Sequence, residues 1–401
     1  MRPWVKNRVL GVLLLAGLAA ALVLAFLTHA PNRLVAGTAI SLAEIVRAMD
    51  GLNAAQALPL LLTGLPALLL VAGVFLRPSR ATHALVGLAA TLLLAGLVGL
   101  AASHANRLAG SAGASSIART SFGGAFWLLT ALSWLMAADA IARLGLKPAW
   151  RLLASAAVTL PVLALLAAGS LNQLSLLKEY ANREAVFNAA LLQHVQIVLG
   201  SLLPALMMGV PLGMASVRPW GRSLRGPLFA TLNIIQTVPS IALFGLLMAP
   251  LALLAASVPL LAQWGIKGVG LAPAVIALTL YSLLPIVRST AAGLGQVAQP
   301  VIEAALGMGL TARQIFWKVE LPLALPIFLA GLRVATVQVI GLAMVAALIG
   351  AGGFGAIMFQ GLLSGALDLV LLGVVPVVAM ALLVDALLNA AALLLTPEFV
   401  D

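Results

Sequence analysis

The sequence predicts an all-α, polytopic membrane protein: a helical bundle of about ten transmembrane helices. Of its 401 residues, 63% are hydrophobic and only 8% are charged, whereas soluble globular proteins carry roughly a quarter charged residues. Its mean hydropathy is +1.15. This composition leaves no room for a sizeable water-soluble domain. The chain has no cysteine, which excludes a disulfide scaffold and thiol catalysis.

Apolar runs of membrane-crossing length recur along the whole chain, since a helix needs about 20 residues to cross a roughly 30 Å hydrocarbon core. The ten runs are 10–27, 57–76, 84–103, 123–143, 150–171, 190–214, 227–250, 269–287, 323–349 and 369–395. The first run follows three basic residues and precedes a poor cleavage site at residues 28–30. A signal peptide fits this pattern, but an uncleaved first helix fits it better.

The lysines and arginines predict the orientation of these spans, because cytoplasmic loops carry an excess of them. With the N-terminus in the cytoplasm, fourteen of the 22 basic residues lie on the inner side, seven lie outside and Arg333 lies within a span. We therefore expect both termini to be cytoplasmic. The net charge of +11 is spread over short inner turns. That spread argues against a nucleic-acid partner, which needs a gathered basic face.

The chain divides into two five-helix units on the sequence evidence. Polar side chains are nearly missing from the middle of the first five spans, and the stretch 172–189 is the most polar before the second half. We take this stretch as an outer connection. It separates a membrane unit over residues 1–187, whose role the sequence leaves open, from a second unit over residues 188–396.

A cytoplasmic segment at about residues 296–322 separates the eighth and ninth spans. Pro300 suits the first turn of a helix. Gly309 then interrupts the helical pattern, and Thr311 with Gln314 has the spacing of a capping box that restarts a helix. The segment therefore predicts two short helices at an angle beneath the membrane.

The same segment resembles the EAA loop of ABC importer permeases. The matching residues, with Val319 where isoleucine is usual, are Glu303, Ala304, Ala305, Gly309, Leu321 and Pro322. This resemblance implies that the C-terminal five helices form a type I ABC importer permease core. It also implies that the loop is the coupling helix that seats in a groove of a cytoplasmic ATPase.

Further stretches of residues 188–396 resemble permeases of the glycine betaine, carnitine and choline importers. They are residues 211–213, 236–240, 281–288 and 350–355. Phe354 stands where leucine is frequent in that branch, and Ser289 where asparagine is common. The resemblance implies a bacterial cytoplasmic membrane location and uptake of a quaternary ammonium osmoprotectant. Its implied partners are an ABC ATPase dimer that carries ATP-Mg, an extracytoplasmic substrate-binding protein and a second permease copy, identical or related.

A polar stripe marks the seventh run. Asn233, Gln236, Thr237 and Ser240 recur at helical spacing on one face, and a lipid-facing position for them would be costly. They are expected either to form hydrogen bonds between helices or to line the solute pathway. Pro239 is expected to kink the helix. Tyr281 and Trp264 are weaker candidates for a cation–π surface, since such aromatics more often pack or form belts.

Two charged residues lie deep within the last two spans. Arg333 and Asp385 each lie ten residues from the inner end of a run, which places both at a depth of roughly 15 Å. An isolated charge at that depth costs several kcal/mol. We therefore expect an intramembrane pair, with a structural role favoured over contact with solute.

Glycines cluster after the ninth span, at what we expect to be the outer face. Gly350, Gly352 and Gly355 match a dinucleotide-binding pattern, but this match is false because no strand precedes it. Together with Gly353 and Phe354, these glycines are expected to form a tight re-entrant turn or an outer gate.

The sequence carries no chemistry of its own. It has no P-loop, and none of its five lysines follows a glycine, so any ATP site must lie on a partner. Its four histidines have no metal-ligand spacing, and we expect neither an enzyme nor a bound cofactor. The alternatives are an ion-coupled secondary transporter, which would need more ionisable residues along the pathway, and an ABC permease for another solute such as an amino acid.

Overall fold

The computed structural model describes residues 4–32, 35, 37–48, 54–112, 117–263 and 265–395; Trp264 therefore lies outside the described residues. The chain forms two compact units, Met1–Asn182 and Arg183–Asp401. The boundary expected after residue 187 lies inside α9 (Glu184–Val217), the first helix of the second unit.

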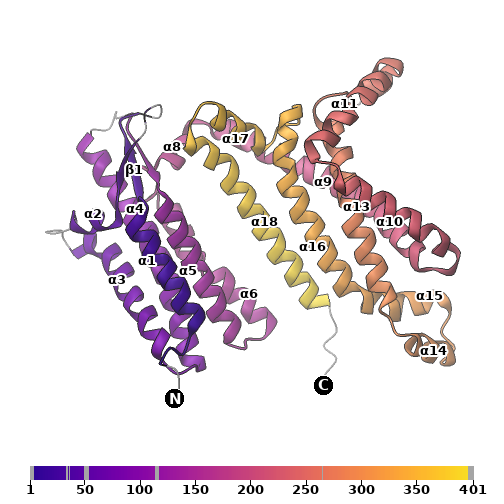
Figure 1. Ribbon diagram of the computed structural model, residues 1–401, viewed down its shortest axis with the longest axis horizontal. Helices are drawn as coiled ribbons and strands as arrows, with labels where there is room; N and C mark the ends of the chain where they lie inside the picture. Colours follow the sequence, from indigo (N-terminus) through magenta and orange to yellow (C-terminus); the bar gives the residue numbers. More distant parts are fainter. Residues whose placement is uncertain are drawn as a thin grey trace. The chain divides into compact units, whose positions relative to one another are not determined.

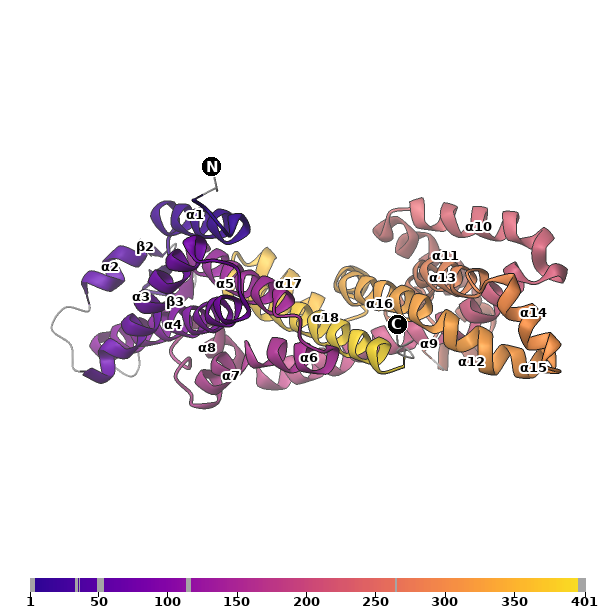
Figure 2. The same cartoon turned by 90° about the horizontal axis from the view of Figure 1, so that it is seen from below.

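Unit 1 is a helical bundle with long apolar helices at its centre. Its helices are α1 (Arg8–Val23), α2 (Leu42–Arg47), α3 (Ala54–Phe75), α4 (Arg80–Ala112), α5 (Gly124–Arg143), α6 (Pro148–Ala157), α7 (Leu160–Ala167) and α8 (Ser175–Asn182). The central helix α4 packs against both α3 and α5. Helix α1 lies along one side of the bundle, against α5 and α3 (Figure 2).

A small antiparallel sheet connects the helices of unit 1 at one end. Its strands are β1 (Leu27–Ala30), β2 (Thr38–Ile40) and β3 (Arg119–Phe122), in the order β2-β1-β3. Thr28 pairs with Ala39 on one side and with Ser121 on the other. The all-α prediction did not include this sheet. Its strands have only three or four residues, too few for alternation to stand out in such an apolar sequence.

Unit 2 is built around α13. Its α-helices are α9, α10 (Arg222–Thr237), α11 (Ser240–Ser257), α12 (Pro259–Gln263), α13 (Leu271–Gly295), α14 (Gln299–Gly307), α15 (Ala312–Ile315), α16 (Leu321–Val345), α17 (Phe354–Leu363) and α18 (Leu367–Leu395). Two 3₁₀ turns, Pro219–Gly221 and Ala346–Ile349, and a π turn, Phe316–Glu320, complete it. Helix α13 packs against α9 and α16, and α16 packs against α18 (Figure 1).

The expected ten spans are only partly present as single helices. Within the described residues, eight helices are long and apolar enough to cross a membrane, or nine if the pair α6 and α7, bent by 41°, counts as one span. Helix α1 has only 16 residues, about 24 Å at 1.5 Å per residue, and is shorter than a typical span. The expected spans 10–27 and 150–171 are therefore a short helix and a broken one.

The single span expected at 227–250 is wrong, because the helix ends before Pro239. Val238 adopts φ −69° and ψ 127°, and a new helix, α11, starts at Ser240. The ring of a proline disfavours helical backbone in the preceding residue. The chain therefore turns between α10 and α11 instead of kinking within one helix (Figure 1).

Candidate functional site

The segment α14–α15 lies at one end of unit 2 and α17 at the opposite end (Figure 1). Gly309 separates α14 from α15 with a φ of +78°, in the left-handed region that suits glycine. The Thr311 backbone N–H donates to Gln314 Oε1 at 2.8 Å, and Thr311 Oγ1 accepts from the Gln314 N–H at 3.4 Å. This is the capping box that the sequence predicts. Helix α15 is not a separate short helix, however, because it continues through the π turn into α16.

Most side chains of helix α14 are exposed. Ala305, only 2% exposed, is its buried side chain and anchors the helix to the unit. Glu303 and Ala304 are exposed, and so is Met308 just after the helix, at 73%. Leu321 and Pro322 lie instead in the first turn of α16, where the missing proline N–H has no partner to lose. Of the predicted coupling residues, Glu303 and Ala304 are therefore exposed on α14, whereas Leu321 and Pro322 form the start of α16.

An ion pair that sequence reasoning missed holds this end of unit 2 together. Arg218, which follows α9, donates through its two terminal nitrogens to Glu320 Oε1 at 2.9 Å and Oε2 at 2.5 Å. The hydrogen bonds to Glu320 raise the pKa of the Arg218 guanidinium, despite an opposing effect of burial. Glu320 ends the π turn and is buried. Arg218 and Glu320 lie 102 positions apart in the sequence, which explains why no local pattern revealed the pair.

The polar residues expected on one helix stripe are divided between two helices. Asn233 Oδ1 accepts from Arg288 at 3.2 Å, and Gln236 Nε2 donates to the Tyr281 carbonyl at 2.6 Å, so both bind α13. The Thr237 hydroxyl donates to its own helix, at the Ile234 carbonyl. Ser240 begins α11 and does not share their face.

Tyr281 fastens the break between α10 and α11. Its hydroxyl donates to the Val238 carbonyl, and its residue surface is only 4% exposed. Because the helix breaks at this point, the Val238 carbonyl has no helical N–H partner, and the Tyr281 hydroxyl supplies a donor instead. In this conformation the Tyr281 ring is not open to a solute. Two outcomes were expected for these residues. The structure shows hydrogen bonds between helices for Asn233 and Gln236, and a lining of the solute pathway stays a prediction.

The glycine cluster forms a tight turn between α16 and α17. Gly350, Gly352 and Gly353 have φ values of +80°, +81° and +73°. Gly355 lies in α17, where an added Cβ would collide with the Met344 carbonyl oxygen. Phe354 is fully buried. The residues therefore make the tight turn that the sequence predicts, and a gating role stays a prediction.

Helix α9 holds this turn through two neighbouring residues. Gln193 Oε1 accepts from the Gly353 N–H at 2.9 Å. His194 is fully buried, with Nε2 3.2 Å from the Ile340 carbonyl and its ring 5.6 Å from that of Phe354. The contact at Gln193 spans 160 residues, so the sequence carried no signal for it.

Replacing Gln193 with leucine is expected to destabilise the turn, because the Gly353 N–H loses its acceptor. The cost is about 1 kcal/mol, and the unfolding midpoint of the purified protein should fall by about 2–4 °C. Gln196→Leu is the matched control: Gln196 lies on the same helix, is exposed and has no hydrogen bond to a described residue. Equal midpoints for the two variants would contradict the assigned contact.

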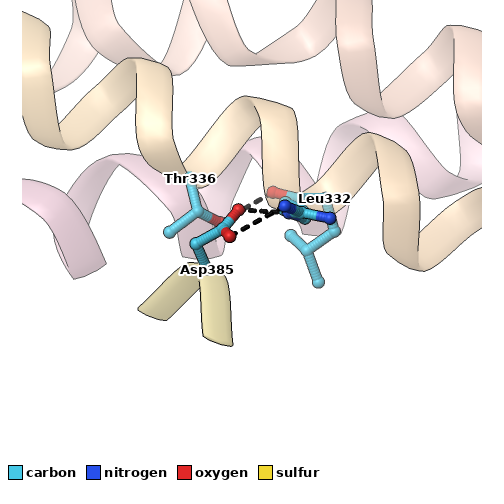
Figure 3. Close-up of polar contacts among 4 residues, drawn as sticks. Leu332, Thr336 and Asp385 are labelled. Atoms are coloured by element: carbon cyan, nitrogen blue, oxygen red, sulfur yellow. Dashed lines mark hydrogen bonds and ion pairs between the residues drawn. The ribbon is translucent and has the colours of Figure 1, made fainter. Parts of the chain in front are cut away.

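Arg333 and Asp385 meet between α16 and α18, as their depth predicts. The guanidinium of Arg333 donates to both carboxylate oxygens, through Nε to Oδ1 and through a terminal nitrogen to Oδ2 at 2.8 Å. Figure 3 shows this pairing beside Thr336, whose hydroxyl donates to the Leu332 carbonyl. The side chains are 44% and 32% exposed in the chain alone. The pair therefore lies at the surface of unit 2.

Two family models together match most of the chain. Residues 6–177 match the N-terminal domain of the ABC transporter permease YehY, and residues 205–399 match the binding-protein-dependent transport system inner membrane component. These ranges lie on either side of the division between the two units.

Curated relatives resemble the second half of the chain. The osmoprotectant import permease protein OsmW of Salmonella typhimurium is 38% identical, over 51% of this chain and 90% of its own. The choline transport system permease protein OpuBB of Bacillus subtilis is 38% identical, over 51% and 86%. The glycine betaine/carnitine/choline permease protein OpuCB of Bacillus subtilis is 36% identical, over 51% and 87%.

The two family matches, together with the long apolar helices, define a membrane component of an ABC transport system. The chain belongs to the family of binding-protein-dependent transport system inner membrane components, the permease subunits of ABC importers. The all-α membrane fold with a type I permease core, and the resemblance to osmoprotectant permeases, are therefore confirmed.

Proposed function

We propose that this chain imports a quaternary ammonium osmoprotectant, such as glycine betaine, choline or carnitine, as the permease of an ATP-driven complex. The names of three relatives supply the solute class. The observation that carries the coupling role is the exposed surface of α14. There a carboxylate, Glu303, lies next to unburied apolar side chains at the end of the bundle.

A cytoplasmic ATPase dimer, with ATP-Mg bound to it, is the partner that fits this surface. Leu306 and Met308 are 54% and 73% exposed, and burial of such side chains at a contact contributes about 25 cal/mol per Å². Glu303 adds a charge for an ion pair or hydrogen bond. Ala305 and the Gly309 turn fix the direction of the helix, so a moving ATPase subunit would carry the whole segment with it.

The Arg218–Glu320 pair gives this motion a route into the long helices of unit 2. Helix α15 continues through the π turn into α16, and Arg218 ties the end of that turn to α9. Force on α14 would therefore move α9 and α16 together. In our proposal, two permease copies rock in this way between inward-facing and outward-facing states.

The opposite end of unit 2 is the proposed docking side for an extracytoplasmic substrate-binding protein. The turn at residues 350–353 lies there, held by Gln193. This assignment places α14 in the cytoplasm. It agrees with the excess of basic residues on the side that we assign to the interior.

Purification and uptake test the proposal together. A tagged chain should recover an ABC ATPase from its own cells, and reconstituted uptake of labelled glycine betaine should stop with vanadate and persist when an ionophore collapses the proton gradient. Uptake that resists vanadate and stops with the ionophore would establish an ion-coupled secondary transporter instead. Competition by an amino acid, without competition by choline or carnitine, would overturn the proposed solute class.

A further inference from the structure

An apolar cavity of about 940 Å³, partly open to the surroundings, lies in unit 1 between α1 and the helices α2, α3, α4 and α5. It is about six times larger than the roughly 150 Å³ of an engineered apolar cavity that binds benzene. Its two hydroxyl side chains are satisfied within their own helices: Thr63 donates to the Leu60 carbonyl and Ser133 to the Leu129 carbonyl. The walls therefore offer almost only hydrocarbon, which favours an apolar occupant over water.

The cavity is long enough for a lipid chain. Its lining on α1 extends from Arg8 to Ala21, about 20 Å at 1.5 Å per residue. One leaflet fills about half of the roughly 30 Å hydrocarbon core, so the cavity is longer than the depth of one leaflet and can take an acyl chain. Gly64 opens the α3 wall, because an added Cβ there would meet no atom within 4 Å.

Positive charge gathers at one end of the cavity. Arg8 lines this end, and the backbone N–H groups of Lys6 and Asn7 donate to the Val74 carbonyl at 2.9 and 3.1 Å. Arg77 lies in the connection between α3 and α4, Arg80 begins α4, and both are exposed. The side chains of Lys6 and Arg8 make no ion pair or hydrogen bond with a described residue.

The described acidic residues of unit 1 do not neutralise this basic end. Asp139 pairs with Arg143 at 2.7 Å, and Glu179 pairs with Arg119 at 3.8 Å. Glu44 accepts from the Ser41 N–H in the capping box of α2. The basic end therefore suits a phosphate, which arginine binds through paired N–H donors.

We propose that unit 1 holds an anionic phospholipid, with an acyl chain in the cavity and its phosphate against Arg8 and Lys6. The inference rests on a chain-length apolar cavity that ends at basic residues which no described acidic side chain of unit 1 neutralises. It gives a ligand to the half of the chain that the EAA segment does not use. The inference does not depend on the transported solute.

Native mass spectrometry of the full chain tests the site. Delipidated protein is titrated with phosphatidylglycerol or phosphatidylcholine, and a single adduct is expected at low molar ratio with phosphatidylglycerol only. Arg8→Gln should weaken that adduct about fivefold, the effect of one basic residue near an anionic lipid. Arg222→Gln, at the start of α10 in unit 2, should leave the adduct unchanged. Equal loss in the two variants would overturn the proposal.

A second pair of variants tests the occupied cavity. Gly64→Leu places a side chain into the open wall and should abolish the adduct while leaving the unfolding midpoint unchanged or higher. Gly245→Leu is the control, since its added Cβ also meets no atom within 4 Å and it does not line the cavity. A Gly64→Leu variant that binds phosphatidylglycerol as the wild type does would refute the site. The site would also be refuted if the wild-type spectrum showed a dimer of the chain that takes up no phosphatidylglycerol.

Discussion

Asp385→Leu is expected to yield poorly folded protein, because it leaves the Arg333 guanidinium without its carboxylate partner on a span of unit 2. The two side chains bind each other through two hydrogen bonds in the present structure. Placing an unpaired arginine near the centre of a membrane helix costs about 2.5–3.5 kcal/mol. We expect a loss of about 2–3 kcal/mol in stability, seen as a lower yield of monodisperse protein and a lower unfolding midpoint.

The double variant Arg333→Met/Asp385→Leu separates pairing from packing. It removes both charges, so most of the lost yield should return, since replacing a whole ion pair by apolar side chains is often neutral or stabilising. Asp385→Asn keeps acceptor and donor atoms and should fall between wild type and leucine. If the double variant is as poor as Asp385→Leu alone, the pair does not hold α16 to α18.

Gly309→Val is expected to uncouple ATP hydrolysis from transport in the proposed complex. The φ of Gly309 is +78°, and a left-handed backbone costs a residue with a side chain roughly 1–2 kcal/mol. An added Cβ would touch nothing within 4 Å, so the penalty arises from the backbone alone. A β-branched residue should redirect α14 relative to α15, leaving ATP hydrolysis while uptake falls at least tenfold.

Two substitutions control for this effect. Gly309→Asn should retain most uptake, because asparagine tolerates left-handed backbone better than other side chains. Gly295→Val, in the last turn of α13, also meets open space but lies in helical backbone, and it should not uncouple. The ratio of solute imported to ATP hydrolysed is the measurement. If Gly309→Val imports as much solute per ATP hydrolysed as the wild type does, the coupling role assigned to Gly309 is wrong.

Features that arise from nearby residues were predictable from the sequence. The capping box of Thr311 and Gln314, the break at Gly309 and the tight turn at 350–353 all depend on neighbours within a few positions. The pairing of Arg333 with Asp385 was also predictable. Equal depth in the membrane, together with the cost of an isolated charge, leaves few other partners.

Features that arise from distant residues were not predictable in this way. Arg218 has many possible acidic partners in sequence, and only the fold selects Glu320. Gln193 likewise meets Gly353 only after α9 and α17 pack together. The break before Pro239 was available in principle, since a proline restricts the residue before it. Apolar residues on both sides of Pro239 gave residues 227–250 the length of a single span.

The π turn at Phe316–Glu320 fixes the rotational phase between the cytoplasmic segment and the span that follows it. Each residue of an α-helix advances the chain by about 100°, and a π turn accommodates one residue more than the α-helix around it. Loss of a single position from this turn would therefore swing α14 and Glu303 around the axis of α16 by more than a quarter of a circle. In the proposed complex, one surplus residue in the π turn would thus set the direction in which α14 faces the ATPase.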